Sequence, residues 1–144
     1  MPSLKEMLRR LWRAGSQSRS AKSVEAFGWL ILIEGAALLM FPHWVADVLT
    51  LPALTPQGAS YLRLAGLLVG GLGMLYVASG RLDSEGFVFA SLLDRPLVPP
   101  AMLVLWWLDV LPAPLALAFA VQDFASFLWT LAAWGADHRD RAAG

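Results

Sequence analysis

Residues 61–80, YLRLAGLLVGGLGMLYVASG, decide the fold class of this chain. The stretch contains one charged residue, Arg63, and is otherwise apolar or small. About 20 consecutive apolar residues are enough for a helix to cross a hydrocarbon core of about 30 Å. Because lipid offers no hydrogen-bond partners to the backbone, such a segment satisfies its own polar groups by forming a helix. The stretch therefore predicts a membrane-spanning helix over residues 61–79.

Three further segments share this apolar character and are bounded by prolines or glycines. They cover residues 24–41, 87–110 and 115–134. Hydrophobic residues make up 58% of the chain and charged residues 15%, against about 45–50% and about 25% in soluble domains. We therefore predict an all-α integral membrane four-helix bundle over residues 24–134, with the lipid bilayer as its surroundings. A polar tail is expected over residues 135–144.

The N-terminal segment, residues 1–23, differs from the rest in its charge. It holds six of the eleven basic residues, and apolar side chains recur beside them at helical spacing: Leu4, Met7, Leu8, Leu11 and Trp12. This pattern is typical of an amphipathic helix lying on an anionic membrane surface. We expect such a helix to precede the bundle.

Loop charges predict the orientation of the four helices. The loops over residues 42–60 and 111–114 contain no Lys or Arg, whereas nine basic residues fall on the side of the two termini. The remaining two, Arg63 and Arg95, lie inside predicted spans. Cytoplasmic loops carry the excess of Lys and Arg, so both termini are expected in the cytoplasm of a multi-pass protein of the cell inner (plasma) membrane.

Several classes of site and partner are excluded by composition. The chain has no Cys, which excludes disulfides, thiolate nucleophiles and Cys-based metal centres. Its two histidines, His43 and His138, are far apart in sequence, and we expect neither a metal nor a cofactor. The net charge is zero and no basic stripe with interleaved aromatics occurs, so nucleic acid is not an expected partner.

Residues 89–100, FASLLDRPLVPP, place an Asp, an Arg and three prolines inside a spanning segment. Proline removes a backbone donor and clashes with the carbonyl four residues earlier, so a kink is expected here. Freed carbonyls are tolerated in a membrane where they face protein or a water-filled cavity. This predicts a polar pocket that opens toward the cytoplasm. In the alternative, residues 84–95 form an interfacial helix and Arg95 snorkels to the headgroups.

Four charged residues lie at similar predicted depth, within about one helical turn of one another: Glu34, Asp94, Arg95 and Asp123. Each costs about 2.5–3.5 kcal/mol near the bilayer centre unless it finds partners, so we expect one shared polar layer. One Arg against three carboxylates implies that at least one carboxyl is protonated at neutral pH. We predict Glu34, Asp94 and Asp123 as acid–base groups, with Arg95 and Gln122 as ligand-binding groups.

Two features are expected to stabilise the bundle. Arg63 and Asp109 fall near the outer face of their helices and can form an interhelical ion pair, with Asp47 as a competing partner. Gly66 and Gly70 form a small-xxx-small pattern, which allows helices to approach closely. That pattern fits either packing within the bundle or a homo-oligomer.

Two stretches carry a resemblance to a known kind of protein. In residues 61–81 an Arg and several glycines lead to a Tyr, and in DFASFLWTLAAW (123–134) an Asp is followed by a Trp-Thr pair. The chain resembles small four-helix bacterial membrane proteins of the DoxX-like and BphX-like kind. The resemblance implies the four-helix topology and carries no catalytic residue over.

Three functions fit these residues. In the first, the polar layer binds a small hydrophobic ligand, or transforms it by acid–base chemistry such as protonation of an epoxide or alkene. In the second, the chain is an accessory subunit of a larger membrane complex. In the third, it is a proton- or cation-coupled transporter that works as an oligomer. The first and third need a water-accessible cavity at Glu34, and the second does not.

Overall fold

The computed structural model describes residues 3–13 and 15–143, and within these ranges every regular element is helical. Four helical segments are long and apolar enough to cross a membrane: Arg19–Met40, Pro56–Arg81, Glu85–Trp107 and Ala113–Ala143. The predicted all-helical chain with four candidate spans is therefore confirmed.

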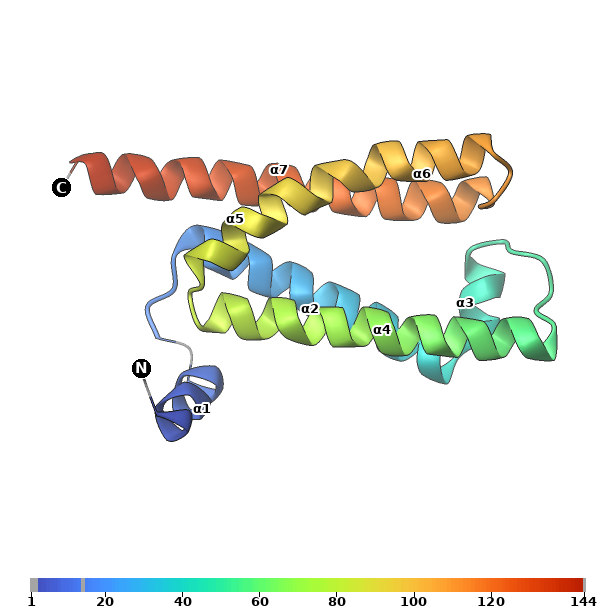
Figure 1. The fold of residues 1–144 in the computed structure, drawn as a ribbon, viewed down its shortest axis with the longest axis horizontal. Coiled ribbons are helices and arrows are strands. Elements are labelled where there is room, and N and C mark those ends of the chain that lie inside the picture. Colours follow the sequence, from blue (N-terminus) through green and yellow to red (C-terminus); the bar gives the residue numbers. More distant parts are fainter. Residues whose placement is uncertain (1–2, 14, 144) are drawn as a thin grey trace.

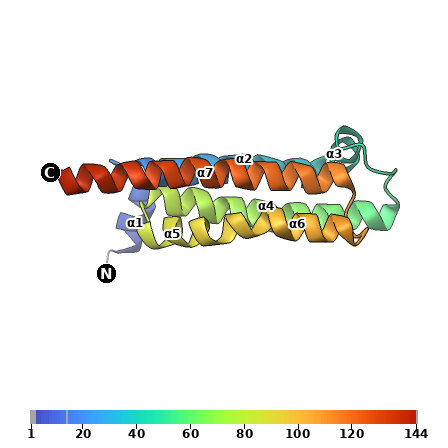
Figure 2. The ribbon, with the colours of Figure 1, turned by 90° about the horizontal axis from the view of Figure 1, so that it is seen from above.

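The elements follow one another as an up-and-down series (Figure 1). Their order and bounds are α1 (Leu4–Trp12), α2 (Arg19–Met40), α3 (Pro42–Val48), α4 (Pro56–Arg81), α5 (Glu85–Asp94), η1 (Arg95–Leu97), α6 (Val98–Trp107) and α7 (Ala113–Ala143). Helix α2 packs on α4 and on α7, while α6 packs on α7, as the two views in Figures 1 and 2 show. Both termini lie at the end that holds the α4–α5 turn, and α3 lies at the opposite end (Figure 1).

Helix starts follow the capping signals of the sequence. Ser18 caps α2 by accepting a hydrogen bond from the Ala21 N–H, and Thr55 caps α4 by accepting one from the Gly58 N–H. Pro56 occupies the first helical position of α4, where a missing N–H costs nothing. Helix α7 continues through the polar segment 135–143 because its side chains find partners there. Asp140 pairs with Arg19 at 3.1 Å, and Arg141 pairs with Glu85 at 2.9 Å.

The closest helix pair, α2 and α4, meets along small residues at every seventh position. On α2 these are Ala21, Gly28 and Gly35, and on α4 they are Ala59, Gly66, Gly73 and Gly80, all of them buried. A seven-residue repeat keeps one seam of each helix facing its partner. A Cβ added at Gly73 would lie 2.6 Å from the Leu32 backbone nitrogen, and one at Gly66 would lie 2.6 Å from that of Leu39. Gly66 therefore serves packing within the chain.

The third span is broken where its prolines lie. α5 ends at Asp94, and the backbone adopts a 3-10 conformation over Arg95–Leu97 before α6 begins. In Figure 1, α5 is inclined to α6 on the two sides of this break. Because Pro96 has no N–H, the i→i−4 hydrogen bonds of the helix are interrupted there. The Val98 N–H donates instead to the Arg95 carbonyl, three residues earlier.

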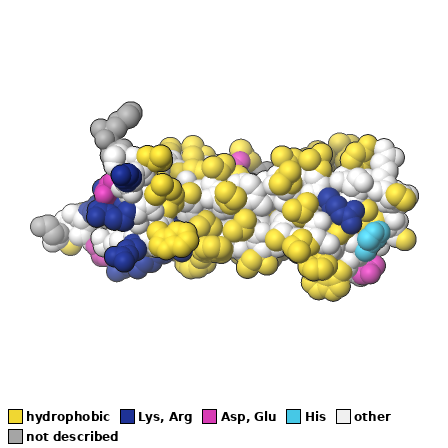
Figure 3. Space-filling model, turned by 90° about the horizontal axis from the view of Figure 1, so that it is seen from below, with side chains coloured by type: hydrophobic (Ala, Val, Ile, Leu, Met, Phe, Trp, Pro, Cys, Tyr) yellow, Lys and Arg dark blue, Asp and Glu magenta, His cyan; other side chains and the backbone are white. Residues whose placement is uncertain are grey.

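The outer surface of the molecule is apolar over its middle and basic at one end. Large hydrophobic side chains from all four candidate spans are exposed, among them Ile33, Leu68, Leu93 and Val121. Figure 3 shows apolar side chains over much of one face, with most of the visible Lys and Arg at the end where the termini lie and one further basic patch toward the opposite end. This distribution is typical of a multi-pass membrane protein, whose lipid-facing surface is as apolar as its interior.

We predict that Gly73→Ala destabilises the protein by about 1–3 kcal/mol, because the added methyl group overpacks a backbone contact. Gly71→Ala is the matched control, since a Cβ there meets no atom within 4 Å. The measurement is reversible unfolding in mixed micelles, followed by circular dichroism. Equal loss of stability in the two variants would contradict the α2–α4 seam.

Candidate functional site

The break in the third span turns Arg95 into the protein. Its side chain is 0% exposed, which makes it the largest of the fully buried side chains. Its Nη1 donates to the Thr130 Oγ1 at 2.9 Å and to the Ser126 carbonyl at 3.2 Å. The alternative in which Arg95 snorkels to the headgroups is therefore wrong, because α7 supplies acceptors inside the molecule.

Two aromatic rings enclose the guanidinium group of Arg95. Its Cζ lies 4.2 Å from the ring centroid of Phe27 on α2 and 5.0 Å from that of Tyr76 on α4. The two rings also contact each other edge to face, with centroids 5.4 Å apart. Desolvated cation–π contacts of this kind contribute about 2 kcal/mol or more. Arg95 thus joins its own span to the other three.

One edge of the guanidinium group forms no hydrogen bond of regular geometry with the described residues, although the Tyr76 side chain packs against the group. Among the residues that the structure describes, none accepts a hydrogen bond from Arg95 Nε or Nη2. These two nitrogens form one fork of the group, whose parallel N–H bonds match the two oxygens of a carboxylate. A buried charged donor without an acceptor is costly, so this edge favours an oxygen ligand.

The predicted carboxylates are distributed unevenly around Arg95. The half-buried Glu34 Oε2 accepts a hydrogen bond from the Gln122 Nε2 at 3.0 Å. Asp123, also half-buried, lies one turn from Ser126 on α7, and its backbone carbonyl accepts a hydrogen bond from the Ser126 hydroxyl at 2.9 Å. The described ion pairs do not include Arg95. Along α7 this polar layer extends over about 12 Å, from Gln122 to Thr130.

Two sequence expectations are corrected by this geometry. Asp94 is exposed, because successive helical residues point about 100° apart and Arg95 points inward. Arg63 and Asp109 are also exposed, and neither takes part in an ion pair among the described residues. The reason is that α4 packs on α2 whereas α6 packs on α7.

Further polar residues of the site were not predicted. The Ser23 Oγ lies 3.0 Å from the Thr130 Oγ1, and the Ser20 Oγ donates to Asp137 at 2.7 Å. The signal for them lies in α7, where Asp123, Ser126, Thr130 and Asp137 recur at intervals of three, four and seven residues. Such spacing places polar side chains on one helix face.

An apolar cavity of about 630 Å³ lies between α6 and α7 and is open to the surface, since Leu103, Trp106 and Leu117 in its lining are exposed. It begins at Pro99, four residues after Arg95, and at Ala120, three residues before Asp123; Met102, Leu103, Trp106 and Leu117 line it further along. The cavity leads away from the end that holds the termini, and its lining is apolar, so it is not the polar pocket that the sequence predicted. Its volume is in the range of sites for small molecules, about 300–1,000 Å³.

Comparison with protein-family models, with curated proteins and with solved structures finds no match. The resemblance to DoxX-like and BphX-like proteins therefore stays a prediction.

We predict that Thr130→Val destabilises the protein by about 1–2 kcal/mol, because it removes the hydroxyl that accepts from Arg95 and keeps the side-chain shape. Ser126→Ala is the control. Arg95 uses the carbonyl of Ser126, whereas the hydroxyl bonds to the Asp123 carbonyl of its own helix. Unfolding in mixed micelles should show a larger loss of stability in Thr130→Val than in Ser126→Ala. A smaller loss of stability in Thr130→Val would contradict this hydrogen-bond network.

Proposed function

We propose that this chain is a four-helix integral membrane protein that binds a small hydrophobic ligand carrying a carboxylate or carbonyl oxygen. The observation that carries the proposal is the unpartnered edge of Arg95, formed by Nε and Nη2 inside the protein. A guanidinium group held between Phe27 and Tyr76 is fixed in orientation, so a ligand oxygen that reached this buried edge would need no further ordering of the side chain.

The apolar part of the ligand has a place beside this edge. The cavity between α6 and α7 begins about one turn from Arg95 on one wall and about one turn from Asp123 on the other. Its lining is almost entirely apolar, so a hydrocarbon chain or ring system gains by leaving water or lipid headgroups. The polar head of the ligand would thus bind at Arg95, and its apolar body would bind in the cavity between α6 and α7.

Acid–base chemistry on such a ligand would fall to Glu34 and Asp123. Glu34 is oriented by Gln122, and Asp123 lies on the same face of α7 as the acceptors of Arg95. A carboxyl group at hydrogen-bond distance from a ligand atom can donate a proton to an epoxide or alkene, or accept one. In this role Arg95 positions the ligand and Gln122 holds the acid, while Asp94 is excluded by its exposure.

An accessory, purely structural function is the second candidate, and one observation favours it. Arg95, on the third candidate span, contacts the other three spans through Phe27, Tyr76 and the α7 acceptors. A residue with these contacts can act as a clasp that holds a small subunit together for docking on a larger complex. The two candidates differ in whether a ligand with a carboxylate is preferred.

The orientation and location belong to the same proposal. Both termini would lie in the cytoplasm, with the chain in the inner membrane of a bacterium, as the loop charges and the DoxX-like resemblance suggest. Helix α1 would lie on the membrane surface, since Leu4, Leu8 and Trp12 are 76%, 55% and 88% exposed along one side of it. An exposed apolar stripe on a basic helix is suited to the headgroup boundary.

The ligand proposal predicts preferential photolabelling by an acid. In membranes containing the full chain, a photoreactive medium-chain fatty acid should label the protein more strongly than the alcohol of the same length. Arg95→Lys should lower this labelling about tenfold, because a point charge does not reproduce the planar fork. Arg63→Lys is the control, since it changes an exposed arginine of another span.

Equal labelling by acid and alcohol, or equal loss in the two variants, would reject ligand binding and leave the structural clasp. For the acid–base step, infrared difference spectra are recorded on addition of the unlabelled acid. We expect changes in carboxyl bands that vanish in Glu34→Gln or Asp123→Asn. Spectra that are the same in both variants and the parent protein would exclude these carboxyls from the chemistry.

Orientation can be tested cleanly because the chain has no Cys. We predict that a single cysteine at Ala53, in the α3–α4 loop, reacts with an impermeant maleimide in intact spheroplasts. A cysteine at Ala142, near the end of α7, should react only after lysis. The reverse pattern would place the termini outside the cytoplasm.

A further inference from the structure

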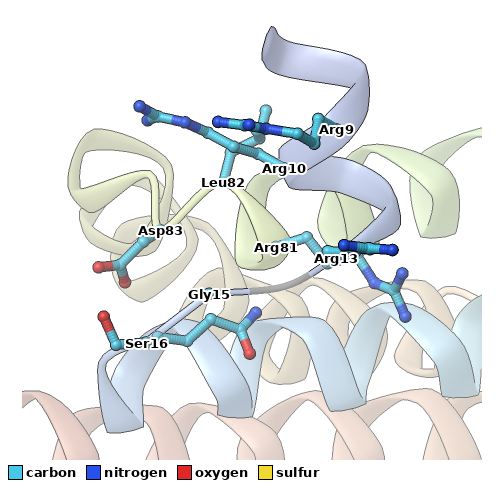
Figure 4. A pocket seen from close by; sticks show the side chains of 9 residues that line it. Arg9, Arg10, Arg13, Gly15, Ser16, Arg81, Leu82 and Asp83 are labelled. Atoms are coloured by element: carbon cyan, nitrogen blue, oxygen red, sulfur yellow. The ribbon is translucent and has the colours of Figure 1, made fainter.

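A second cavity, of about 490 Å³, lies at the end of the molecule where the termini are. It is enclosed by α1, by residues 15–17 and by the turn that follows α4. Figure 4 shows Arg9 and Arg10 of α1 on one side of it and Ser16 and Asp83 on the other. The site is separate from Arg95 in sequence and place.

The lining of this cavity is strongly basic. It contains four arginines, Arg9, Arg10, Arg13 and Arg81, and a single acid, Asp83. Two nearby carboxylates reduce the excess positive charge of the lining without cancelling it. Glu6 pairs with both Arg9 and Arg10, and Glu25 pairs with Arg81. Arg13 takes part in no ion pair among the described residues.

The walls of the cavity are held together by hydrogen bonds. Arg81 donates through Nη1 to the Leu11 carbonyl and through Nε to Glu25, each at 2.8 Å. Gln17 donates to the Gly80 carbonyl at 2.9 Å. Asp83 accepts a hydrogen bond of 2.6 Å from the Ser18 hydroxyl, so its charge is already engaged. The end of α1 is therefore held against the end of α4 by Arg81.

We infer that this cavity is a binding site for a phosphate group, carried either by an anionic phospholipid headgroup or by a small phosphorylated molecule. Guanidinium forks bind phosphate oxygens bidentately, and several forks around one cavity suit a group with three or four oxygens. The cavity also lies at the end of the candidate spans, where lipid phosphates are found, beside a helix whose Leu4, Leu8 and Trp12 are exposed.

The charge of the site should be constant near neutral pH. Hydrogen bonds from Arg9 and then Arg10 hold the pKa of Glu6 below its usual value. A lowered pKa means that the Glu6 ion pairs are present at neutral pH and are lost only as pH falls through that lowered value. Binding of a phosphodiester should therefore change little between about pH 6 and 8.

The test uses the full chain in detergent micelles and a pair of charge-matched variants. Binding of phosphatidylglycerol and of phosphatidylcholine is measured by native mass spectrometry, and binding of glycerol 3-phosphate by calorimetry. Arg13→Gln removes one charge from the cavity, whereas Lys5→Gln removes one from the same helix outside it. Arg10→Gln is a second lining variant.

We expect phosphatidylglycerol to bind more tightly than phosphatidylcholine, with affinity about tenfold lower in Arg13→Gln and changed less than about twofold in Lys5→Gln. Glycerol 3-phosphate could instead bind about tenfold more weakly to Arg13→Gln than to Lys5→Gln, while the two lipids bind equally. That result would support the site and assign it to a soluble phosphorylated ligand. Equal losses in Arg13→Gln and Lys5→Gln would show diffuse surface charge and overturn the inference, as would no binding of either probe by the parent protein.

Discussion

Burial of the Arg95 guanidinium group constrains the rest of this structure. A charge in the interior of an apolar molecule is stable only where dipoles, hydroxyls and aromatic faces surround it. Here α7 provides the Thr130 hydroxyl and the Ser126 carbonyl, while α2 and α4 provide Phe27 and Tyr76. The rotation of all three helices about their axes is thereby coupled to one side chain. The 3-10 break at Arg95–Leu97 then directs that side chain inward and leaves Asp94 outside.

The glycine seam between α2 and α4 is a precondition for this arrangement. A Cβ at Gly28 would lie 2.8 Å from the Tyr76 Cβ, so the backbones approach closely at the level where the two aromatic rings enclose Arg95. Phe27 precedes that glycine directly, and its ring meets Tyr76 edge to face. Phe87, at the start of the third span, adds a further edge-to-face contact with Tyr76, at 4.9 Å between centroids. A wider helix separation would open this aromatic cluster and expose the charge.

Hydropathy and local signals predicted a large part of this architecture. The four spans follow from apolar runs of sufficient length, and the break follows from Pro96. The caps at Ser18 and Thr55 were not among the predictions, although their side-chain oxygens are a usual capping signal. The contacts of the polar layer did not follow, because hydropathy does not determine which face of a helix meets its neighbour. Asp94 and Arg95 are indistinguishable by depth, yet a rotation of about 100° separates interior from surface. The aromatic partners of Arg95 could not be told from the many other apolar residues of the spans. The serines and Thr130 could likewise not be told from the other small residues.

The contact between Asp137 and the start of α2 has a consequence for the order in which the chain assembles. Asp137 accepts from the backbone N–H groups of Arg19 and Ser20, while Ser18 accepts from that of Ala21 through its side chain and from that of Lys22 through its carbonyl. The Ser18 N–H donates to the Asp83 Oδ1, so all four donors without a partner inside α2 are satisfied, those of Arg19 and Ser20 by Asp137. These two bonds form only when α7 packs beside α2, because Asp137 lies 118 and 117 residues farther along the chain than Arg19 and Ser20. Docking of α7 and full capping of α2 are therefore linked events.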